Sequence, residues 1–193
     1  ILFTNIFQFG RAPNKREIVR SYPWFAAALF ASIFLTSLFI NDYPTALLTV
    51  AIGVMMVIFS VNLLFGVTLP VGPGRGWQIG VGTLSGVLGG LSSIWSPPVA
   101  MYLIARNASK DMFIGTTGFL FLVGCLPLGA GLVISGLITW PVIVKSLVGL
   151  MMTLTGFRIG EILRNRVSQE KFRQIVLVAF LIMGVRLIAV GLI

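Results

Sequence analysis

Long apolar runs separated by short charged segments are the feature that most limits how this chain can fold. Only 10% of the residues are charged and 57% are hydrophobic, whereas a soluble domain carries about 25% charged residues. A run of about 20 apolar residues is long enough to cross the roughly 30 Å hydrocarbon core of a bilayer. The pattern predicts an all-α polytopic membrane protein with full-length helices over residues 22–40, 44–69, 111–137, 141–163 and 172–192.

Residues 77–106 form an apolar segment with a polar interruption at residues 92–96. Before the interruption, Gly82, Gly86 and Gly90 are spaced four residues apart. Residues at this spacing share one helix face, and glycines there allow a second backbone to approach closely. The segment therefore reads as two half-helices joined by a break.

The second half-helix has a clear start signal. Ser96 followed by Pro97 predicts Ser96 as the N-cap and Pro97 as the first helical residue. Pro97 and Pro98 both lack an N–H, which leaves Val99 and Ala100 as the expected free backbone donors. Non-helical backbone at membrane depth is tolerated only where protein buries it or where it lines a watery cavity. We therefore expect a ligand to bind at the break.

The basic residues predict how the chain is threaded through the membrane. Residues 1–21 hold four of them and residues 157–173 hold five, so both segments are expected on the cytoplasmic side of the inner membrane, where they also meet anionic lipid headgroups. Residues 77–106 must then begin and end on the same side. Two crossings need about 40 residues, and this segment has about 30, so we expect a re-entrant hairpin.

Two of the predicted helices contain similar short stretches, VNLL at 61–64 and VRLI at 185–188. In the predicted topology these helices run in opposite directions, which indicates an inverted-repeat transporter with its site at the repeat interface. Residues 1–69 would be the remainder of an incomplete first repeat, and residues 70–193 would be the second repeat with its hairpin. The chain is accordingly expected to be N-terminally incomplete.

Two polar residues inside predicted spans have open roles. Arg186 either has a function or extends its charge to the membrane surface. Asn62 is expected to hydrogen-bond across helices.

Several motifs resemble those of the TauE/SafE sulfite exporter family: the glycine-rich run 82–90, the following Pro97-Pro98, the GTT at 115–117 and the GFRIG at 156–160. The resemblance covers most of residues 70–193. It implies a bacterial inner-membrane carrier of sulfite, sulfonates or related small organic anions. The family usually has a glycine-rich turn before the proline, where this chain has Ser-Ser-Ile-Trp-Ser.

The candidate substrate-binding residues surround the break. The serine hydroxyls can donate hydrogen bonds to an oxyanion beside a positive helix end, or they only satisfy the backbone of the broken helix. Trp95 either gates the cavity or packs against a neighbouring helix, and the glycines are expected to pack rather than bind. The two threonines either donate to the substrate or bond back to their own helix. The candidates are Ser85, Gly86, Gly89, Gly90, Ser92, Ser93, Trp95, Ser96, Pro97, Pro98, Val99, Thr116 and Thr117.

Composition argues against several other functions. The chain has no histidine, five carboxylates and one cysteine, Cys125, so we expect no metal site, no disulfide and no cofactor. The net charge of +9 resides in short loops, which favours lipid contact over nucleic acid, and no GxxxxGK[ST] loop for nucleotide is present. We expect secondary transport of a small anion such as sulfite or an organosulfonate. An anion channel, a membrane-embedded enzyme or an assembly factor is the alternative, and a homo-oligomer is an open possibility.

Overall fold

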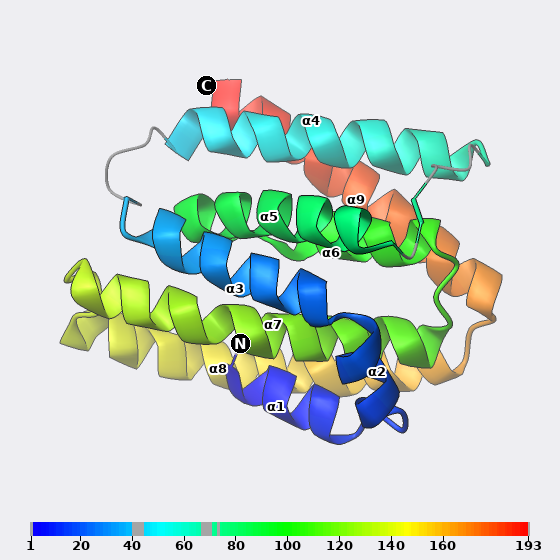
Figure 1. Ribbon diagram of the computed structural model, residues 1–193, viewed down its shortest axis with the longest axis horizontal. Coiled ribbons are helices and arrows are strands. Elements are labelled where there is room, and N and C mark those ends of the chain that lie inside the picture. Colours follow the sequence, from blue (N-terminus) through cyan, green and yellow to red (C-terminus); the bar gives the residue numbers. More distant parts are fainter. Residues whose placement is uncertain (1, 40–44, 67–70, 73, 193) are drawn as a thin grey trace.

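The computed structural model describes residues 2–39, 45–66, 71–72 and 74–192. In this part of the chain the structure holds helices and no strand, which confirms the predicted all-α fold (Figure 1). Helices suit such apolar runs because each one satisfies its backbone N–H and C=O groups internally. The helices are α1 (Leu2–Gly10), α2 (Lys15–Ser21), α3 (Pro23–Ser37), α4 (Thr45–Leu64), α5 (Arg75–Ser92), α6 (Ser96–Ala105), α7 (Lys110–Ile134), α8 (Trp140–Asn165) and α9 (Gln169–Leu192).

Among the described residues, three helices are long and apolar enough to cross a bilayer: α7, residues 140–160 of α8, and α9. The adjoining helices α2 and α3, bent by 69° between them, together have the length and composition of a fourth span. In α4 the apolar stretch Thr49–Leu64 is shorter. These features are those of a multi-pass membrane protein. The predicted helix start at Pro44 and the end at residues 67–69 lie outside the described residues.

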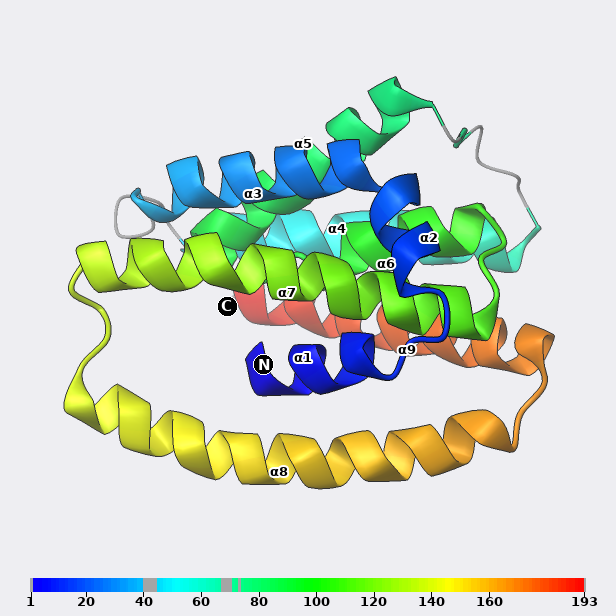
Figure 2. The ribbon, with the colours of Figure 1, turned by 60° about the horizontal axis from the view of Figure 1, so that its bottom comes forward.

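The predicted hairpin is present as two helices that run in opposite directions. α5 begins at one end of the molecule, and α6 returns to that end (Figure 1 and Figure 2). Near this end, the Tyr102 hydroxyl of α6 donates a hydrogen bond to the carbonyl of Gly72, 3.4 Å away and just before α5. α6 has 10 residues, which span about 15 Å as a helix, so α6 is too short to cross the bilayer. The chain therefore reverses direction inside the molecule.

The links that follow α6 and α8 meet at this same end (Figure 1). The ammonium group of Lys110 donates to the carbonyl of Val167 at 2.7 Å. The side-chain amide of Gln169 donates to the carbonyl of Ala108 at 2.9 Å. The contact between these two links is what the charge-based topology requires. The cytoplasmic placement of this end stays a prediction.

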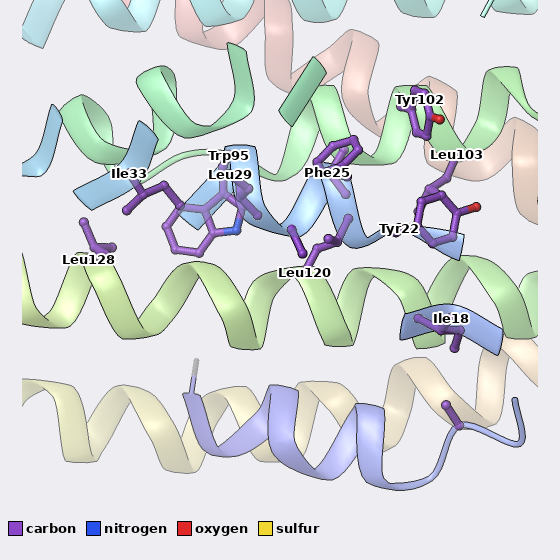
Figure 3. Close-up of a cluster of buried hydrophobic side chains, with 13 residues drawn as sticks. Ile18, Tyr22, Phe25, Leu29, Ile33, Trp95, Tyr102, Leu103, Leu120 and Leu128 are labelled. Atoms are coloured by element: carbon purple, nitrogen blue, oxygen red, sulfur yellow. The ribbon is translucent and has the colours of Figure 1, made fainter. Parts of the chain in front are cut away.

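α6 lies at the centre of the molecule, and all of its residues from Pro97 to Ile104 are buried. It shares a buried apolar cluster with α3 and α7, in which Phe25, Val99 and Leu120 are fully enclosed (Figure 3). α8 lies at the periphery instead (Figure 2), and none of the described residues in its apolar stretch is buried. The hairpin is therefore the part of the fold around which the other helices are arranged.

The predicted role of Asn62 is wrong. Its side-chain amide donates to the carbonyl of Ile58 in its own helix at 2.7 Å, because the backbone acceptor one turn back is always within reach of such a side chain. Arg186 is exposed on α9, which favours contact with the surroundings over an internal role.

The support for the inverted repeat is the direction in which the paired helices run. α4 and α9 run in opposite directions, as do α3 and α8 (Figure 1). The repeat relation itself, and the boundary between residues 1–69 and 70–193, stay predictions.

Candidate functional site

The turn between α5 and α6 brings together the polar residues of the predicted break. α5 ends at Ser92, and the N–H of Ser93 donates to the carbonyl of Gly89 at 2.7 Å. Ser93 adopts the left-handed conformation, with φ of 60°, which is a common way to end a helix. α6 begins at Ser96, directly after Trp95. The break is therefore short and well defined.

This turn lies beside the middle of α7. The Trp95 ring meets Phe121 edge-on, with ring centroids 5.9 Å apart. A Cβ added to Gly124 would lie 3.5 Å from the indole nitrogen of Trp95. Phe121 and Gly124 flank the midpoint of α7, a helix long enough to cross a bilayer. The break is thus level with the middle of a candidate span, where irregular backbone is exceptional.

The three serines of the turn differ in what their hydroxyls already bond. Ser92 donates to the carbonyl of Leu88 at 2.6 Å and accepts from the N–H of Ile94 at 3.3 Å, so it satisfies the backbone of the broken helix. The hydroxyls of Ser93 and Ser96 make no hydrogen bond with the described residues; Ser93 is exposed and Ser96 is partly buried. Ser93 and Ser96 therefore keep donors for a ligand, whereas Ser92 does not.

The start of α6 corrects the predicted cap. α6 begins one residue earlier than expected, so its N-cap is Trp95 rather than Ser96, and no side chain caps the helix. Since the N-cap carbonyl accepts the first intrahelical hydrogen bond, the N–H of Val99 is used inside the helix. Pro97 and Pro98 have no N–H. Ser96 therefore supplies the free N–H of this first turn, in place of the expected Val99 and its neighbour.

Trp95 is 4% exposed and fills the space between α5 and α7. A Cβ added to Gly89 would lie 2.9 Å from the Cβ of Trp95, so glycine is needed there to seat the tryptophan. The indole N–H is buried and has no partner in the part of the chain that the structure describes. Burying an unpaired donor costs about 1–3 kcal/mol. Trp95 therefore packs against α7, as one alternative predicted, while keeping an unsatisfied donor in the interior.

The other predicted glycines pack against α3. A Cβ at Gly86 would lie 2.5 Å from the Cβ of Ser32 and 2.9 Å from the carbonyl oxygen of Leu29. A Cβ at Gly90 would meet the hydroxyl of Thr36. The backbones of α3 and α5 can approach this closely only without side chains at these positions, which is the packing role expected for them.

The remaining candidates, Ser85, Thr116 and Thr117, are all buried. Ser85 donates to the carbonyl of Val81 at 2.7 Å. Thr117 donates back to its own helix and accepts from the amide of Gln8 at 3.1 Å. The hydroxyl of Thr116 is buried without a partner among the described residues. Of these three, only Thr116 has an unused hydroxyl.

Sequence reasoning missed several buried polar residues, among them Gln78 and Ser60. Gln78 on α5 accepts from the N–H of Phe25 at 3.3 Å and donates to the carbonyl of Ser21 at 2.8 Å. It lies one turn before Gly82 on the same helix face, so the four-residue spacing of the glycines was a signal for it. Ser60 on α4 is fully buried, and its hydroxyl has no described partner. A single serine in an apolar run offers no comparable signal.

The turn offers neutral donors to a ligand. No charged residue occurs between Arg75 and Arg106 in the sequence. No group of three or more His, Cys, Asp or Glu side chains that could hold a metal ion is found among the described residues. Hydroxyls, a backbone N–H and the positive end of α6 are the groups that suit an oxyanion here.

Comparison with known proteins agrees with this chemistry. The family model described as "Sulfite exporter TauE/SafE" matches residues 1–187 of the 193-residue chain. No curated protein and no solved structure matches the chain. The match includes the hairpin, every helix around it and most of α9.

Proposed function

Since the chain belongs to the TauE/SafE sulfite exporter family, we propose that it is a secondary carrier that moves sulfite or an organosulfonate by alternating access around the α5–α6 turn. Membership makes the chain a membrane transport protein for sulfite or a related anion rather than an enzyme. The proposal adds the substrate, the binding position and the mechanism, with export across the inner membrane as the expected physiological role.

The binding position is the break in the hairpin. The observation that carries it is that the hydroxyls of Ser93 and Ser96 have no described partner, although the turn lies beside the middle of α7. Together with the N–H of Ser96, they form a group of neutral donors at the positive end of α6. Neutral donors hold an anion less tightly than a fixed positive charge would. The anion is therefore released more easily on the far side of the membrane.

Trp95 is the proposed gate. Its ring lies between Gly89 of α5 and Gly124 of α7, and its buried indole N–H has no described partner. A rotation of this ring would open a path along α7 and would bring the N–H to the substrate. Thr116 lies on the same face of α7 as Gly124, two turns nearer the end where the hairpin opens, and its unused hydroxyl would be the next donor along this path.

The test is sulfite flux in vesicles reconstituted with the purified full-length protein. Ser96→Ala removes a hydroxyl with no described protein partner, so we expect about a tenfold rise in the sulfite concentration for half-maximal flux, at an unchanged melting temperature. This corresponds to the loss of one charge-assisted hydrogen bond. Ser146→Ala, at an exposed position on α8, is the matched control and should leave both measurements unchanged. Wild-type flux in a Ser93→Ala, Ser96→Ala double variant would exclude this binding position.

A counterflow assay distinguishes the proposed carrier from the alternative, an anion channel. A carrier with a gate at Trp95 accelerates the uptake of labelled sulfite when unlabelled sulfite is present inside the vesicle. A channel shows no such acceleration and gives single-channel currents. The enclosed position of Trp95 favours the carrier.

A further inference from the structure

A pocket lies far from the hairpin turn, between the last turn of α4 and the first turns of α9. Its volume is about 280 Å³. The buried side chains of Leu63 and Leu177 form an apolar floor, and Glu170, Arg173 and Gln174 supply polar groups. The end of α4 and the start of α9, which line the pocket, lie at the end of the molecule where the links after α6 and α8 meet (Figure 1).

Arg173 lines this pocket and has an unused donor. Its Nε–H is buried and has no hydrogen-bond partner among the described residues. A buried guanidinium N–H without an acceptor is unfavourable, so a ligand that supplies an acceptor would be stabilised here. The acceptor that best matches the planar fork of a guanidinium is a phosphate or another oxyanion, which can take two parallel hydrogen bonds.

The pocket also has negative groups that disfavour a simple anion. Glu170 lines the same pocket, and among the described residues its carboxylate accepts a single hydrogen bond, from the amide of Gln174 at 3.4 Å. The carboxyl end of α4, at Leu63 and Leu64, adds partial negative charge. A ligand with a phosphate and a nearby ammonium group satisfies both Arg173 and these negative groups.

The surroundings of the pocket favour a lipid as the source of this chemistry. Leu64 and Val178 line the pocket and are 38% and 45% exposed. On a membrane helix such apolar side chains face acyl chains. A free phosphate compound would make no use of this apolar surface.

We propose that this pocket binds the phosphoethanolamine headgroup of a membrane phospholipid, with its phosphate on Arg173 and its ammonium group on Glu170. The lipid would tie the end of α4 to the start of α9. This lipid site is separate from the α5–α6 turn, and the proposal does not depend on which substrate the protein transports.

The test is lipid binding to the delipidated full-length protein, measured by native mass spectrometry and by the shift in melting temperature. We expect phosphatidylethanolamine to bind at least fivefold more tightly than phosphatidylcholine, because a choline group has no N–H to donate to Glu170. Arg173→Gln should weaken phosphatidylethanolamine binding about tenfold. Lys171→Gln is the matched control, since it removes the same charge from an exposed neighbour on α9.

Further variants separate the contributions of the two charges. Arg173→Lys keeps the charge without the Nε–H and should give an intermediate loss. Glu170→Gln should abolish the preference over phosphatidylcholine while retaining binding. Equal losses in Arg173→Gln and Lys171→Gln, or equal affinity for the two lipids in the wild type, would overturn the proposal. A further outcome is that inorganic phosphate, at equal phosphate concentration, raises the melting temperature by as much as the lipid does. That result would assign the pocket to a free oxyanion and overturn the lipid assignment.

Discussion

The helix pairs α3–α5 and α4–α9 have the most extensive contacts in the described structure, and both are packed through glycine. In α3–α5 the glycines belong to α5 alone, and the two helices run in the same direction. In α4–α9 both helices supply glycines: a Cβ at Gly53 would lie 2.7 Å from the carbonyl oxygen of Gly184, and a Cβ at Gly184 would lie 2.9 Å from the carbonyl oxygen of Gly53. Gly191 of α9 adds a third close approach, since a Cβ there would lie 2.6 Å from Val50. Small residues allow such close packing in a membrane, where no hydrophobic effect drives helices together.

The two pairs differ in their polar contacts. Gln78 of α5 accepts a hydrogen bond from the N–H of Phe25, which caps the start of α3, and it donates to the carbonyl of Ser21 at the end of α2. Thr36 also donates to the carbonyl of Gly86 at 3.3 Å. On α4, by contrast, Asn62 bonds its own helix and the hydroxyl of Ser60 has no described partner.

This difference indicates which pair sets the geometry of the α5–α6 turn. Hydrogen bonds between particular partners fix the register of α3 against α5, and so they fix the depth at which the hairpin ends. Close contact between glycines fixes the distance between two helices more strongly than their register along the helix axis. We therefore expect α4–α9 to shift more easily during a transport cycle, and α3–α5 to move as a unit with the hairpin.

The largest effect is expected from Gly86→Leu. The new side chain would collide with Ser32 and with the backbone of α3, neither of which can rotate away, so we expect a loss of about 3 kcal/mol in the free energy of unfolding and a loss of sulfite flux. Thermal unfolding of the purified protein in detergent measures the first quantity. The control is Gly80→Leu on the same helix, where an added Cβ meets nothing within 4 Å. Equal losses for the two variants would show that α3–α5 packing is not the constraint.

A smaller effect is expected from Gly53→Leu in the other pair. Its Cβ would lie 2.7 Å from the carbonyl oxygen of Gly184, a looser approach than the 2.5 Å between a Cβ at Gly86 and Ser32, so we expect a loss of about 2 kcal/mol. The matched substitution is Gly149→Leu on α8, where an added Cβ is unobstructed. A greater loss for Gly53→Leu than for Gly86→Leu, in the same unfolding assay, would reverse the comparison between the pairs.

The smallest of the three effects is expected from Gln78→Met, which keeps the side-chain volume but removes the hydrogen bonds to Phe25 of α3 and to Ser21 at the end of α2. We expect a loss of about 1.5 kcal/mol, the range for a helix cap and a buried unsatisfied partner. Asn62→Leu on α4 removes a bond within one helix and should change stability by less than about 0.5 kcal/mol. If the two variants unfold at the same temperature, the polar contacts of α3–α5 contribute nothing specific.

Much of the fold was predictable from particular residues. The helices follow from apolar runs of membrane length, and the reversal at the hairpin follows from its 30-residue length together with the placement of basic residues on either side. The packing role of Gly86 and Gly90 follows from their four-residue spacing, and the structure confirms it.

The candidate site was predicted less completely. The sequence placed Ser92, Ser93 and Ser96 at the break, but it did not distinguish the one that bonds its own helix from the two that do not. It also misplaced the cap of α6 by one residue. Local signals locate a helix boundary only approximately, and the unused N–H groups depend on the residue at which the helix begins.

By itself, then, the sequence determined the membrane class, the broken hairpin, the family and the presence of hydroxyl donors at the break, because these depend on composition and on spacing along the chain. Only the tertiary structure decided that Trp95 is enclosed against α7, that Gln78 caps α3, and that Arg173 lines a pocket with α4. Each of these depends on contacts between helices distant in the sequence, and such contacts exist only once the backbones have packed together.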